Sequence, residues 1–429
     1  MKLIFFLLTF SLVVSGQVQD NNLTIKLDEY FNALTSIKNF NGNVIIAKKG
    51  NVLLDKSYNI KDTSNNIVVD KDSKFIIASV SKIFIKFAIL KLVEQNKLQL
   101  TDKLNRFISD FPNGDKITVE HLMQHRSGLP RELKEYEEYD SLSLNQIVDL
   151  AKAENLQFEP GTRIFYSNVG YFILHYIIQK ASDYGYLNFV QKEIFNKMNL
   201  KNTFEFNSSN KINDFAYGYY LDNEIIRPVK LKDINRFETG NYATTINDLY
   251  SFSEQILSGK ALNKSLALKM FDGDSLITQA GGRPGYRAYF YKNIKSDITF
   301  IFTSNFSNVP FQEVIDNVFN ILSGKPFQIP RKVERIETYV AADVLKSYVG
   351  KFALEVDPKQ QFIIRTNENK LIFEDLEGNS VTLYPESESV FFDNPKSKDS
   401  YIFIYNSESN KYDLTIHTSG MQLKTKRIE

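Results

Sequence analysis

The sequence has 429 residues, which is too long for one ordinary hydrophobic core and suits about two or three domains. Hydrophobic residues make up 43% of the chain and charged residues 24%, which is typical of a soluble globular protein. The absence of cysteine excludes disulfides, thiolate nucleophiles and thiolate metal sites. The net charge of +1 gives no reason to expect a nucleic acid or an acidic membrane as a partner.

Histidines are scarce as well, and they do not combine metal-ligand spacing with a nearby carboxylate. We therefore expect no metal site, and no motif indicates a cofactor. The four histidines are His121, His125, His175 and His417.

The N-terminus has the features of a secretory signal peptide over residues 1–16. A lysine at position 2 precedes an apolar run from Leu3 to Val14, and small residues lead to a plausible cleavage point after Gly16. The run is too short for a comfortable membrane span, and no later segment is as long. We expect an exported protein, periplasmic or extracellular, that is soluble after signal-peptide removal. No feature predicts an oligomeric state.

In chain order, apolar spacing predicts a first helix over residues 24–38 and then a β-hairpin over 44–54. Two strand-like runs come late in the chain, at 287–291 and 298–304. Between hairpin and late strands the pattern is mostly helical, and one more helix follows the strands. The expected helices cover 118–125, 143–153, 168–180, 186–198, 245–257 and 311–322. This order predicts an α+β fold whose hairpin and late strands form one mainly antiparallel sheet.

The composition and the spacing of apolar residues change at the expected end of the first domain. Residues 324–330 contain two prolines and have the composition of a linker. Beyond them, short alternating apolar segments separated by polar turns predict a small all-β barrel or sandwich. We expect the first domain at 17–323, the linker at 324–333 and the all-β domain at 334–429.

The chemistry is predicted to centre on Ser79 and Lys82, which would lie one helical turn apart on one face. From Ile83 to Leu90 nearly every residue is apolar, which indicates a buried helix. Burial disfavours the charged form of a lysine, and a neutral amine beside a hydroxyl is a general base beside a nucleophile. The alternative is an N-capping serine with a lysine that extends to solvent. The same spacing recurs at Ser208 in a polar stretch, to which we assign no function.

Tyr166-Ser-Asn168 precedes another apolar helix and could complete this site. A tyrosine fixed between rigid elements can present its hydroxyl to a serine and pass a proton to a leaving group. Asn168 could orient the lysine or hold a substrate amide, and the alternative is that it caps the helix. The same Tyr-x-Asn spacing also occurs at Tyr30, Tyr186 and Tyr291, so the spacing alone is not specific.

A glycine-rich stretch, Gln279-Ala-Gly-Gly-Arg-Pro-Gly285, leads into the late strands. Glycines there would let a ligand or another backbone approach the strand edge. An N–H from this edge and the N–H of Ser79 would make an oxyanion hole with two donors. In isolation the stretch favours an ordinary turn.

Taken together and in order, the motifs resemble those of the serine β-lactamases, with class C enzymes as the most similar branch. Relatives of that branch include penicillin-binding proteins, D-amino-acid peptidases and esterases. The resemblance covers roughly residues 25–323, and the region from Leu345 onward more loosely resembles the barrel-like domain often appended to such hydrolases. The motifs are Ile76–Lys82, His125–Leu129, Tyr166–Tyr171, Gly240–Leu249 and Gln279–Gly285.

The resemblance implies that Ser79 is the acylated nucleophile, Lys82 its base and Tyr166 the partner in proton transfer. It implies an oxyanion hole made by the N–H groups of Ser79 and Gly282. The fold that it implies is β-lactamase/transpeptidase-like, with a helix-flanked antiparallel sheet beside an all-helical lobe. The expected substrate-binding residues are Asn168, Gln279, Gly281, Gly282 and Arg283.

One position departs from the family pattern. Gln279 stands where the family usually has a lysine or histidine, a cation that helps to hold a substrate carboxylate. Glutamine offers hydrogen bonds without charge, so the recognition of a penicillin or of a terminal D-alanine is in question. Arg283 or Arg287 could supply the charge instead.

We therefore expect an exported serine hydrolase that acts through an acyl-enzyme on a small-molecule or peptide substrate. Amides and esters qualify, among them D-amino-acid peptides, small acyl esters and β-lactams, and an esterase or peptidase is favoured over an antibiotic-hydrolysing enzyme. The alternative is a catalytically weak penicillin-binding or sensory protein that retains the fold. Gln279 favours this alternative, whereas Ser79, Lys82 and Tyr166 argue against it.

Overall fold

The structure is a computed structural model that describes residues 20–429 with some gaps. The gaps are residues 63, 66, 140, 208–210, 223, 231–234, 237, 274, 359, 368–369 and 419–420. The expected signal peptide and Ser208 therefore lie outside the described residues. The chain forms two compact units, one ending at Val309 and the other running from Pro310 to Glu429.

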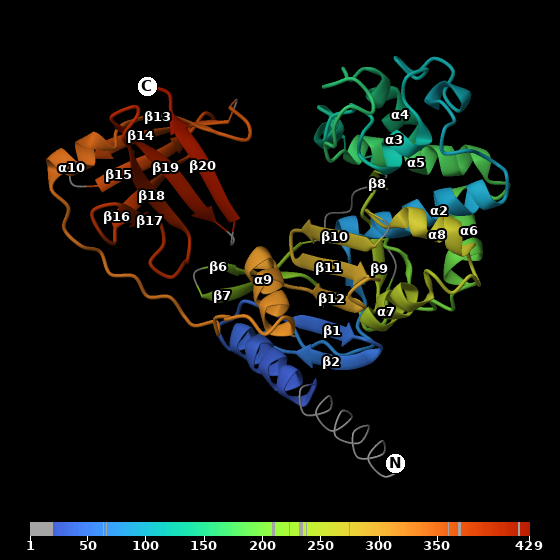
Figure 1. The fold of residues 1–429 in the computed structure, drawn as a ribbon, viewed down its shortest axis with the longest axis horizontal. Helices are drawn as coiled ribbons and strands as arrows, with labels where there is room; N and C mark the ends of the chain where they lie inside the picture. The colour runs from blue at the N-terminus through green and yellow to red at the C-terminus, as the bar shows by residue number, and fades with distance from the viewer. Residues whose placement is uncertain are drawn as a thin grey trace, which may run out of the picture. The chain divides into compact units, whose positions relative to one another are not determined.

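A five-stranded antiparallel sheet of order β10-β11-β12-β1-β2 lies in the first unit (Figure 1). The predicted hairpin is present, because β1 pairs with β2 around the turn at Lys49 and Gly50. On its other side β1 pairs with β12, so the early hairpin and the late strands share one sheet. This confirms the predicted α+β arrangement. The strands are β1 (Gly42–Lys48), β2 (Asn51–Tyr58), β10 (Leu276–Arg283), β11 (Tyr286–Asn293) and β12 (Ile298–Ser304).

The edge strand β10 is the main element that the sequence pattern did not predict. Its glycine-rich sequence is typical of a turn, and it was therefore expected to be a turn before the late strands. In the structure β10 pairs in register with β11 from Leu276 opposite Asn293 to Arg283 opposite Tyr286. Glycine weakens a strand because it contributes no side chain to pack, so the pairing partner and not the local sequence defines this element.

The predicted helices of the first unit are present near their expected bounds, and the short helix α8 and the 3-10 turns η2, η3 and η5 were not predicted. The N-terminal helix includes residues 20–36. The helix expected over 186–198 is α-helical only to Val190 and continues as a π-helical turn, η4 (Gln191–Phe195). The α-helices are α2 (Lys82–Glu94), α3 (Val119–Met123), α4 (Leu144–Lys152), α5 (Asn168–Ala181), α6 (Tyr186–Val190), α7 (Ile246–Gln255) and α8 (Lys264–Ala267). The short 3-10 turns are η1 (Ala78–Ser81), η2 (Leu104–Arg106), η3 (Tyr136–Glu138) and η5 (Leu268–Met270).

Helix α2 is central to the core of this unit. It is apolar on nearly all sides, as the sequence predicts, and most of its residues are buried. Phe84 packs edge-on against Phe252 of α7 and Phe195 of η4, with ring centroids 4.9 and 5.2 Å apart. Burying a phenylalanine contributes about 1.5–3 kcal/mol. These contacts fix the helix, and with it the turn that precedes it.

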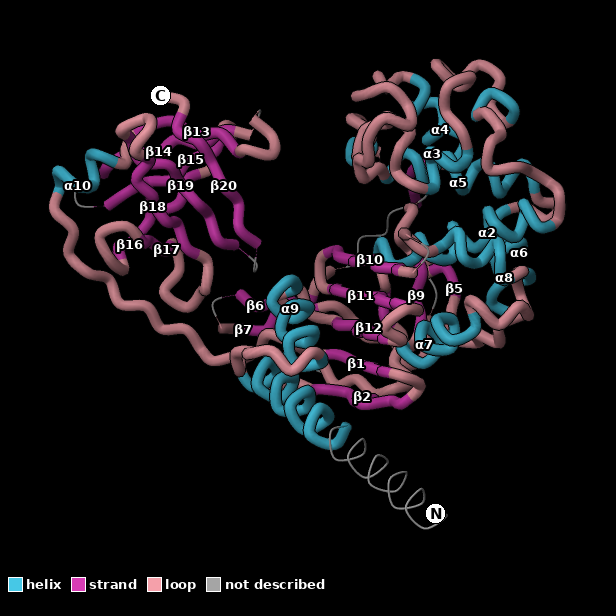
Figure 2. Tube along the Cα trace, in the orientation of Figure 1, coloured by secondary structure: helices cyan, strands magenta, loops and turns pink. Residues whose placement is uncertain are grey.

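A second, three-stranded sheet of order β3-β9-β5 leads into that turn (Figure 2). It is made of very short strands that the sequence pattern did not predict. Phe75 of β3 pairs with Thr244 of β9, and Phe204 of β5 pairs with Ala243 of β9. The strands are β3 (Phe75–Ile76), β5 (Phe204–Glu205) and β9 (Tyr242–Thr244). Two further small sheets pair β4 (Ser141–Leu142) with β8 (Asn235–Arg236), and β6 (Tyr219–Asp222) with β7 (Ile225–Pro228).

The second unit contains a closed antiparallel barrel of eight strands, β13 to β20 (Figure 1). Inside it, Tyr348 stacks on Phe403 at 4.2 Å and lies beside Phe391 and Leu414 in one buried cluster. This confirms the predicted all-β region, although the sequence pattern did not predict β13. The strands are β13 (Gly350–Leu354), β14 (Gln361–Asn367), β15 (Lys370–Asp375), β16 (Ser380–Pro385), β17 (Val390–Phe392), β18 (Ser400–Asn406), β19 (Lys411–Thr418) and β20 (Met421–Arg427), with helices α9 (Phe311–Leu322) and α10 (Ala342–Ser347) before them.

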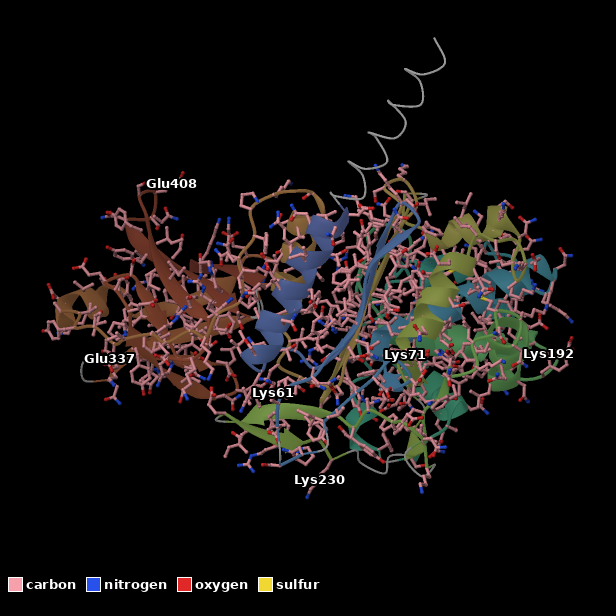
Figure 3. The ribbon with its side chains drawn as sticks, turned by 90° about the horizontal axis from the view of Figure 1, so that it is seen from below. Lys61, Lys71, Lys192, Lys230, Glu337 and Glu408 are labelled. Carbon is pink, nitrogen blue, oxygen red and sulfur yellow. The ribbon has the colours of Figure 1, made fainter. Side chains whose placement is uncertain are left out.

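Charged side chains lie at the periphery of both units, as Figure 3 shows for labelled lysines and glutamates. Lys71 and Lys192 of the first unit and Glu408 of the second are all exposed. Within the described ranges, every helix is too short or too polar to cross a bilayer.

A closed barrel has no free strand edges, so the C-terminal region should fold by itself. We predict that a fragment from Arg331 to Glu429 is folded, and that limited proteolysis of the full chain cuts within Gly324–Gln328, which is exposed or half-buried throughout. Circular dichroism of the fragment and mass spectrometry of the digest would measure this. A fragment without a cooperative unfolding transition would contradict the expected boundary.

Candidate active site

Ser79 lies in the 3-10 turn η1, directly before α2, and its side chain is half-buried. The preceding residue, Ala78, has a φ of +45°, a left-handed conformation that is uncommon outside glycine. Such residues persist only where the surroundings hold them, and they gather at functional sites. The backbone therefore turns sharply at the predicted nucleophile.

Two glycines allow other strands to hold this turn. A Cβ atom on Gly281 of β10 would lie 2.2 Å from the Ile77 carbonyl oxygen, and one on Gly240 would lie 3.0 Å from the Ala78 carbonyl carbon. Only glycine permits the first of these approaches. In addition, the Ile77 N–H donates to the Tyr242 carbonyl of β9 at 3.0 Å. The turn is thus fixed between β9 and β10.

Lys82, the first residue of α2, is 1% exposed. Its Nζ lies 3.3 Å from Ser79 Oγ. Burial lowers the pKa of Lys82 to about 7, opposed by the charge of Glu132 and assisted by that of Arg131. The rings of Tyr166 and Tyr171 lie 5.2 and 5.3 Å from Nζ and favour the cation, but desolvation outweighs them. A large fraction of Lys82 is therefore neutral near pH 7 and able to accept a proton.

Tyr166 reaches Ser79 from the loop before α5. Its hydroxyl donates to Ser79 Oγ at 2.8 Å. Burial raises the pKa of Tyr166 above its ordinary value, partly offset by the hydrogen bond to Ser79. The phenol therefore remains protonated in the resting site. Ser79 Oγ thus has Tyr166 Oη and Lys82 Nζ within hydrogen-bonding distance, as the motif resemblance implies.

His125 positions Tyr166, although the sequence analysis assigned it no role. Its ring stacks on that of Tyr166 with centroids 4.5 Å apart, and its Nδ1 accepts the Ser167 N–H at 3.1 Å. Burial lowers the pKa of His125 to about 3, assisted by the charges of Lys86 and Lys82. The imidazole is therefore neutral. Its left-handed backbone, with φ of +58°, sits just before the Ser127-Gly128 turn, and no local pattern would distinguish it from an ordinary turn residue.

Asn168 does not cap its helix. The cap of α5 is Ser167, whose Oγ accepts the Gly170 N–H at 2.9 Å. The Asn168 amide instead donates to Glu132 Oε1 at 2.6 Å. Its Oδ1 is buried without a hydrogen-bond partner among the described residues, which leaves one acceptor for a ligand. Glu132 was not predicted, because its position after Leu129-Pro-Arg has no motif that marks it.

The remaining predicted residues lie along β10, and they are not equivalent. Gln279 is close enough for its side chain to interact with the Tyr166 hydroxyl. Gly282 belongs to an edge strand, which pairs on one side only. Arg283 is already engaged, because its Nη1 donates to Glu238 at 3.1 Å and to Asn241 at 3.2 Å. Arg287 donates to the Arg283 and Tyr286 carbonyls instead.

This arrangement can support acyl transfer. A buried amine of lowered pKa and a protonated phenol both contact one hydroxyl, a set of groups that can act as base, acid and nucleophile. The edge strand β10 and the first turn before α2 supply backbone N–H groups nearby. Within the described residues, no group of three or more histidine or acidic side chains could hold a metal ion.

Comparison with protein-family models gives one match, described as Beta-lactamase, over residues 35–323. Penicillin-binding protein 4* of Bacillus subtilis is 27% identical to this chain over 412 residues, which is 85% of this chain and 90% of that protein. Protein flp of Staphylococcus aureus is 28% identical over 167 residues, which is 37% of this chain and 34% of that protein.

Solved structures of related fold are also known. The octameric penicillin-binding protein homologue from Pyrococcus abyssi aligns with a TM-score of 0.61 at 20% identity, over 93% of this chain and 99% of its own. The D-amino acid amidase of Ochrobactrum anthropi SV3 aligns with a TM-score of 0.58 at 20% identity, over 70% of this chain and 99% of its own. EstCE1, a hydrolase with promiscuous acyltransferase activity, aligns with a TM-score of 0.55 at 18% identity, over 68% of this chain and 96% of its own. At these identities the likeness concerns the fold alone.

The two neighbouring glycines of β10 offer a matched test of the turn. In Gly281→Ala the new Cβ would overlap the Ile77 carbonyl oxygen, so β10 must move away from the turn before α2. In Gly282→Ala the new Cβ makes an ordinary contact at 3.6 Å with Arg287. We expect Gly281→Ala to lose about 1–3 kcal/mol of unfolding free energy or more, and Gly282→Ala much less. Chemical denaturation measures both, and equal losses would contradict the close approach.

The burial of Lys82 generates a prediction about stability. Because the folded pKa of about 7 lies below the ordinary 10.5, folding releases a proton and wild-type stability rises with pH between these values. Lys82→Met removes this cost, so it should be more stable than wild type by a few kcal/mol at pH 6.5. The advantage should shrink towards pH 10. Denaturation at both pH values tests this, and a variant that is less stable at pH 6.5 would contradict it.

Proposed function

The chain belongs to the beta-lactamase family, and on that premise we propose that it is a serine hydrolase that acts through an acyl-enzyme at Ser79. The observation that carries the proposal is the contact of Ser79 Oγ with Lys82 Nζ at 3.3 Å and with Tyr166 Oη at 2.8 Å, where the lysine pKa is lowered to about 7. A serine that only capped a helix would not need a buried amine of this kind beside it. The substrates are amides or esters.

In the proposed acylation, neutral Lys82 accepts the Ser79 proton while Oγ attacks the substrate carbonyl carbon. The oxyanion that forms accepts hydrogen bonds from the N–H groups of Ser79 and Gly282. Tyr166 then donates its phenolic proton to the leaving amine or alcohol, and protonated Lys82 returns a proton to the phenolate. The result is an ester at Ser79 and a neutral leaving group. Water attacks this ester in the second half of the cycle, with Lys82 or Tyr166 as base.

Asn168 is proposed to bind the substrate rather than to act on protons. Its buried Oδ1 lacks a partner among the described residues, and an unpaired buried acceptor costs about 1–3 kcal/mol. A substrate amide N–H would satisfy it. The hydrogen bond to Glu132 fixes the orientation of the amide group, because it occupies the Nδ2 side.

The charges around the site favour substrates without a carboxylate at the Gln279 position. Gln279 is neutral, and Arg283 is neutralised by Glu238. We therefore propose an esterase or peptidase for neutral acyl esters or D-amino-acid-containing amides, over an antibiotic-hydrolysing enzyme. Gln279 also supports a second candidate, a catalytically weak penicillin-binding or sensory protein. Acylation without turnover would distinguish the second from the first.

Further proposals concern location and organisation. We propose that residues 1–16 direct export and that the hydrolase domain ends at 323, where the match to the family model also ends. The segment 324–333 then joins it to the barrel-containing region 334–429. No cofactor enters this scheme.

The proposal is tested by labelling with a fluorophosphonate and with a fluorescent β-lactam. Intact-mass and peptide analysis should find one adduct on Ser79, and Ser79→Ala should lose it. Because Lys82 acts when neutral, the labelling rate should rise as pH increases through about 7 and then level off. Ser409→Ala, which alters an exposed serine of the barrel-containing unit, is the matched control. Labelling that persists in Ser79→Ala would refute the assignment.

The neutral Gln279 predicts a change of specificity when a cation is introduced. In Gln279→Lys, a charge-assisted hydrogen bond to a substrate carboxylate should add about 1.5–3 kcal/mol, or roughly one to two decades in affinity. We expect kcat/KM to rise more for a penicillin or a D-alanyl peptide than for a neutral ester. Gln279→Met is the uncharged control.

Steady-state kinetics of wild type and the Gln279 variants on both substrate types measures this change in kcat/KM. Equal changes on both types would show that position 279 does not contact the carboxylate. A selective loss of carboxylate turnover in Arg283→Ala would instead assign recognition to Arg283, although its contacts with Glu238 and Asn241 argue against that role.

A further inference from the structure

A cleft outside the Ser79 site lies between residues of α6, η4 and the small sheet that contains β5 and β9. Its volume is about 230 Å³, which suits a small organic molecule rather than a drug-sized one. The residues that line it are Leu187, Asn188, Gln191, Phe195, Glu205 and Tyr242. The mechanism proposed above uses none of them.

Glu205 gives this cleft its charge. It stands opposite Tyr242 in the pairing of β5 with β9, so the two side chains share one face of the sheet. Burial raises the pKa of Glu205 to about 7. The carboxyl makes no hydrogen bond or ion pair with another described residue, although a half-buried carboxylate is normally compensated by one. The site thus has an acid that lacks a counter-charge.

The other polar atoms of the cleft are also acceptors. The Asn188 amide nitrogen donates to the Tyr184 carbonyl at 3.2 Å, and that of Gln191 donates to Asn196 at 2.8 Å. The amide oxygens of both residues remain, and no described residue donates to them. A carboxylate and two amide oxygens make a lining that accepts hydrogen bonds, which is complementary to a donor-rich cation.

The apolar part of the cleft is aromatic. The rings of Phe195 and Tyr242 meet edge to face with centroids 5.4 Å apart, and Tyr242 Oη pairs with Tyr186 Oη at 2.5 Å. Leu187 adds an aliphatic wall that is 52% exposed. A ligand that fits has a small apolar body and one ammonium group.

We propose that this cleft binds a small organic amine, whose ammonium pairs with Glu205 while its apolar body packs on Leu187 above the buried rings of Phe195 and Tyr242. The ligand belongs to the class of primary arylalkyl or alkyl amines. Tyr242 also connects the cleft to the turn that bears Ser79, since its carbonyl accepts the Ile77 N–H and its N–H donates to Ser81 Oγ at 3.3 Å. The proposal does not depend on the chemistry assigned to Ser79.

Calorimetric titration of the full chain with phenethylamine tests the proposal, with 2-phenylethanol as the uncharged analogue of the same shape. We expect saturable binding of the amine and binding of the alcohol that is at least about tenfold weaker. Glu205→Gln, which keeps the shape and removes the charge, should weaken the amine by at least about tenfold as well. The matched control is Glu132→Gln, which removes an exposed acid beside Asn168 and should leave the amine affinity unchanged.

Two results would overturn the proposal. One is equal affinity of wild type for the amine and the alcohol, which needs no variant and is therefore independent of any folding defect. The other is amine binding that is lost in Glu132→Gln and retained in Glu205→Gln, which would move the amine to the Ser79 site. The Ser79→Ala variant separates this test from the proposed function, because amine binding in the cleft should persist when the nucleophile is absent.

Discussion

The burial of a single amine, Lys82, is the constraint on which the site depends. Its aliphatic chain and Nζ lie within the apolar surroundings of α2, where a charge is poorly solvated. A lysine in water is protonated at neutral pH and cannot accept a proton from a hydroxyl. Here the core that holds α2 also lowers the lysine pKa to about 7, so the packing of α2 favours the neutral amine that the proposed base requires. Stability and reactivity are therefore opposed at this position.

Ser79, the proposed nucleophile, is fixed from the other side by backbone rather than by side chains. The turn at Ala78 is left-handed, and it persists because β9 and β10 lie against it. Glycine at 281 is what allows β10 to come so close. The same strand also carries Gln279, whose side chain interacts with the Tyr166 hydroxyl, so one edge strand both supports the turn and contacts the tyrosine beside Ser79.

The sequence predicts those parts of the molecule that local pattern determines. The apolar run after Lys82, the hairpin at Gly50 and the alternating strands of the barrel follow from periodicity and turn residues, and the structure confirms them. Strand β10 could not be predicted in this way, because its glycines weaken local strand propensity, although its partner β11 follows directly in a hairpin. Glu132 and His125 were missed for a different reason, since their contacts are with Asn168 and Tyr166, which lie far along the chain.

The central claim is that Lys82 is neutral near physiological pH, and its pKa can be measured directly. An NMR titration of the full chain labelled with 13C at lysine Cε would follow each lysine, and comparison with Lys82→Met would assign the resonance. We predict one lysine that titrates near pH 7, well below the ordinary value of 10.5. A Lys82 resonance that remains that of a protonated amine up to pH 10 would contradict it.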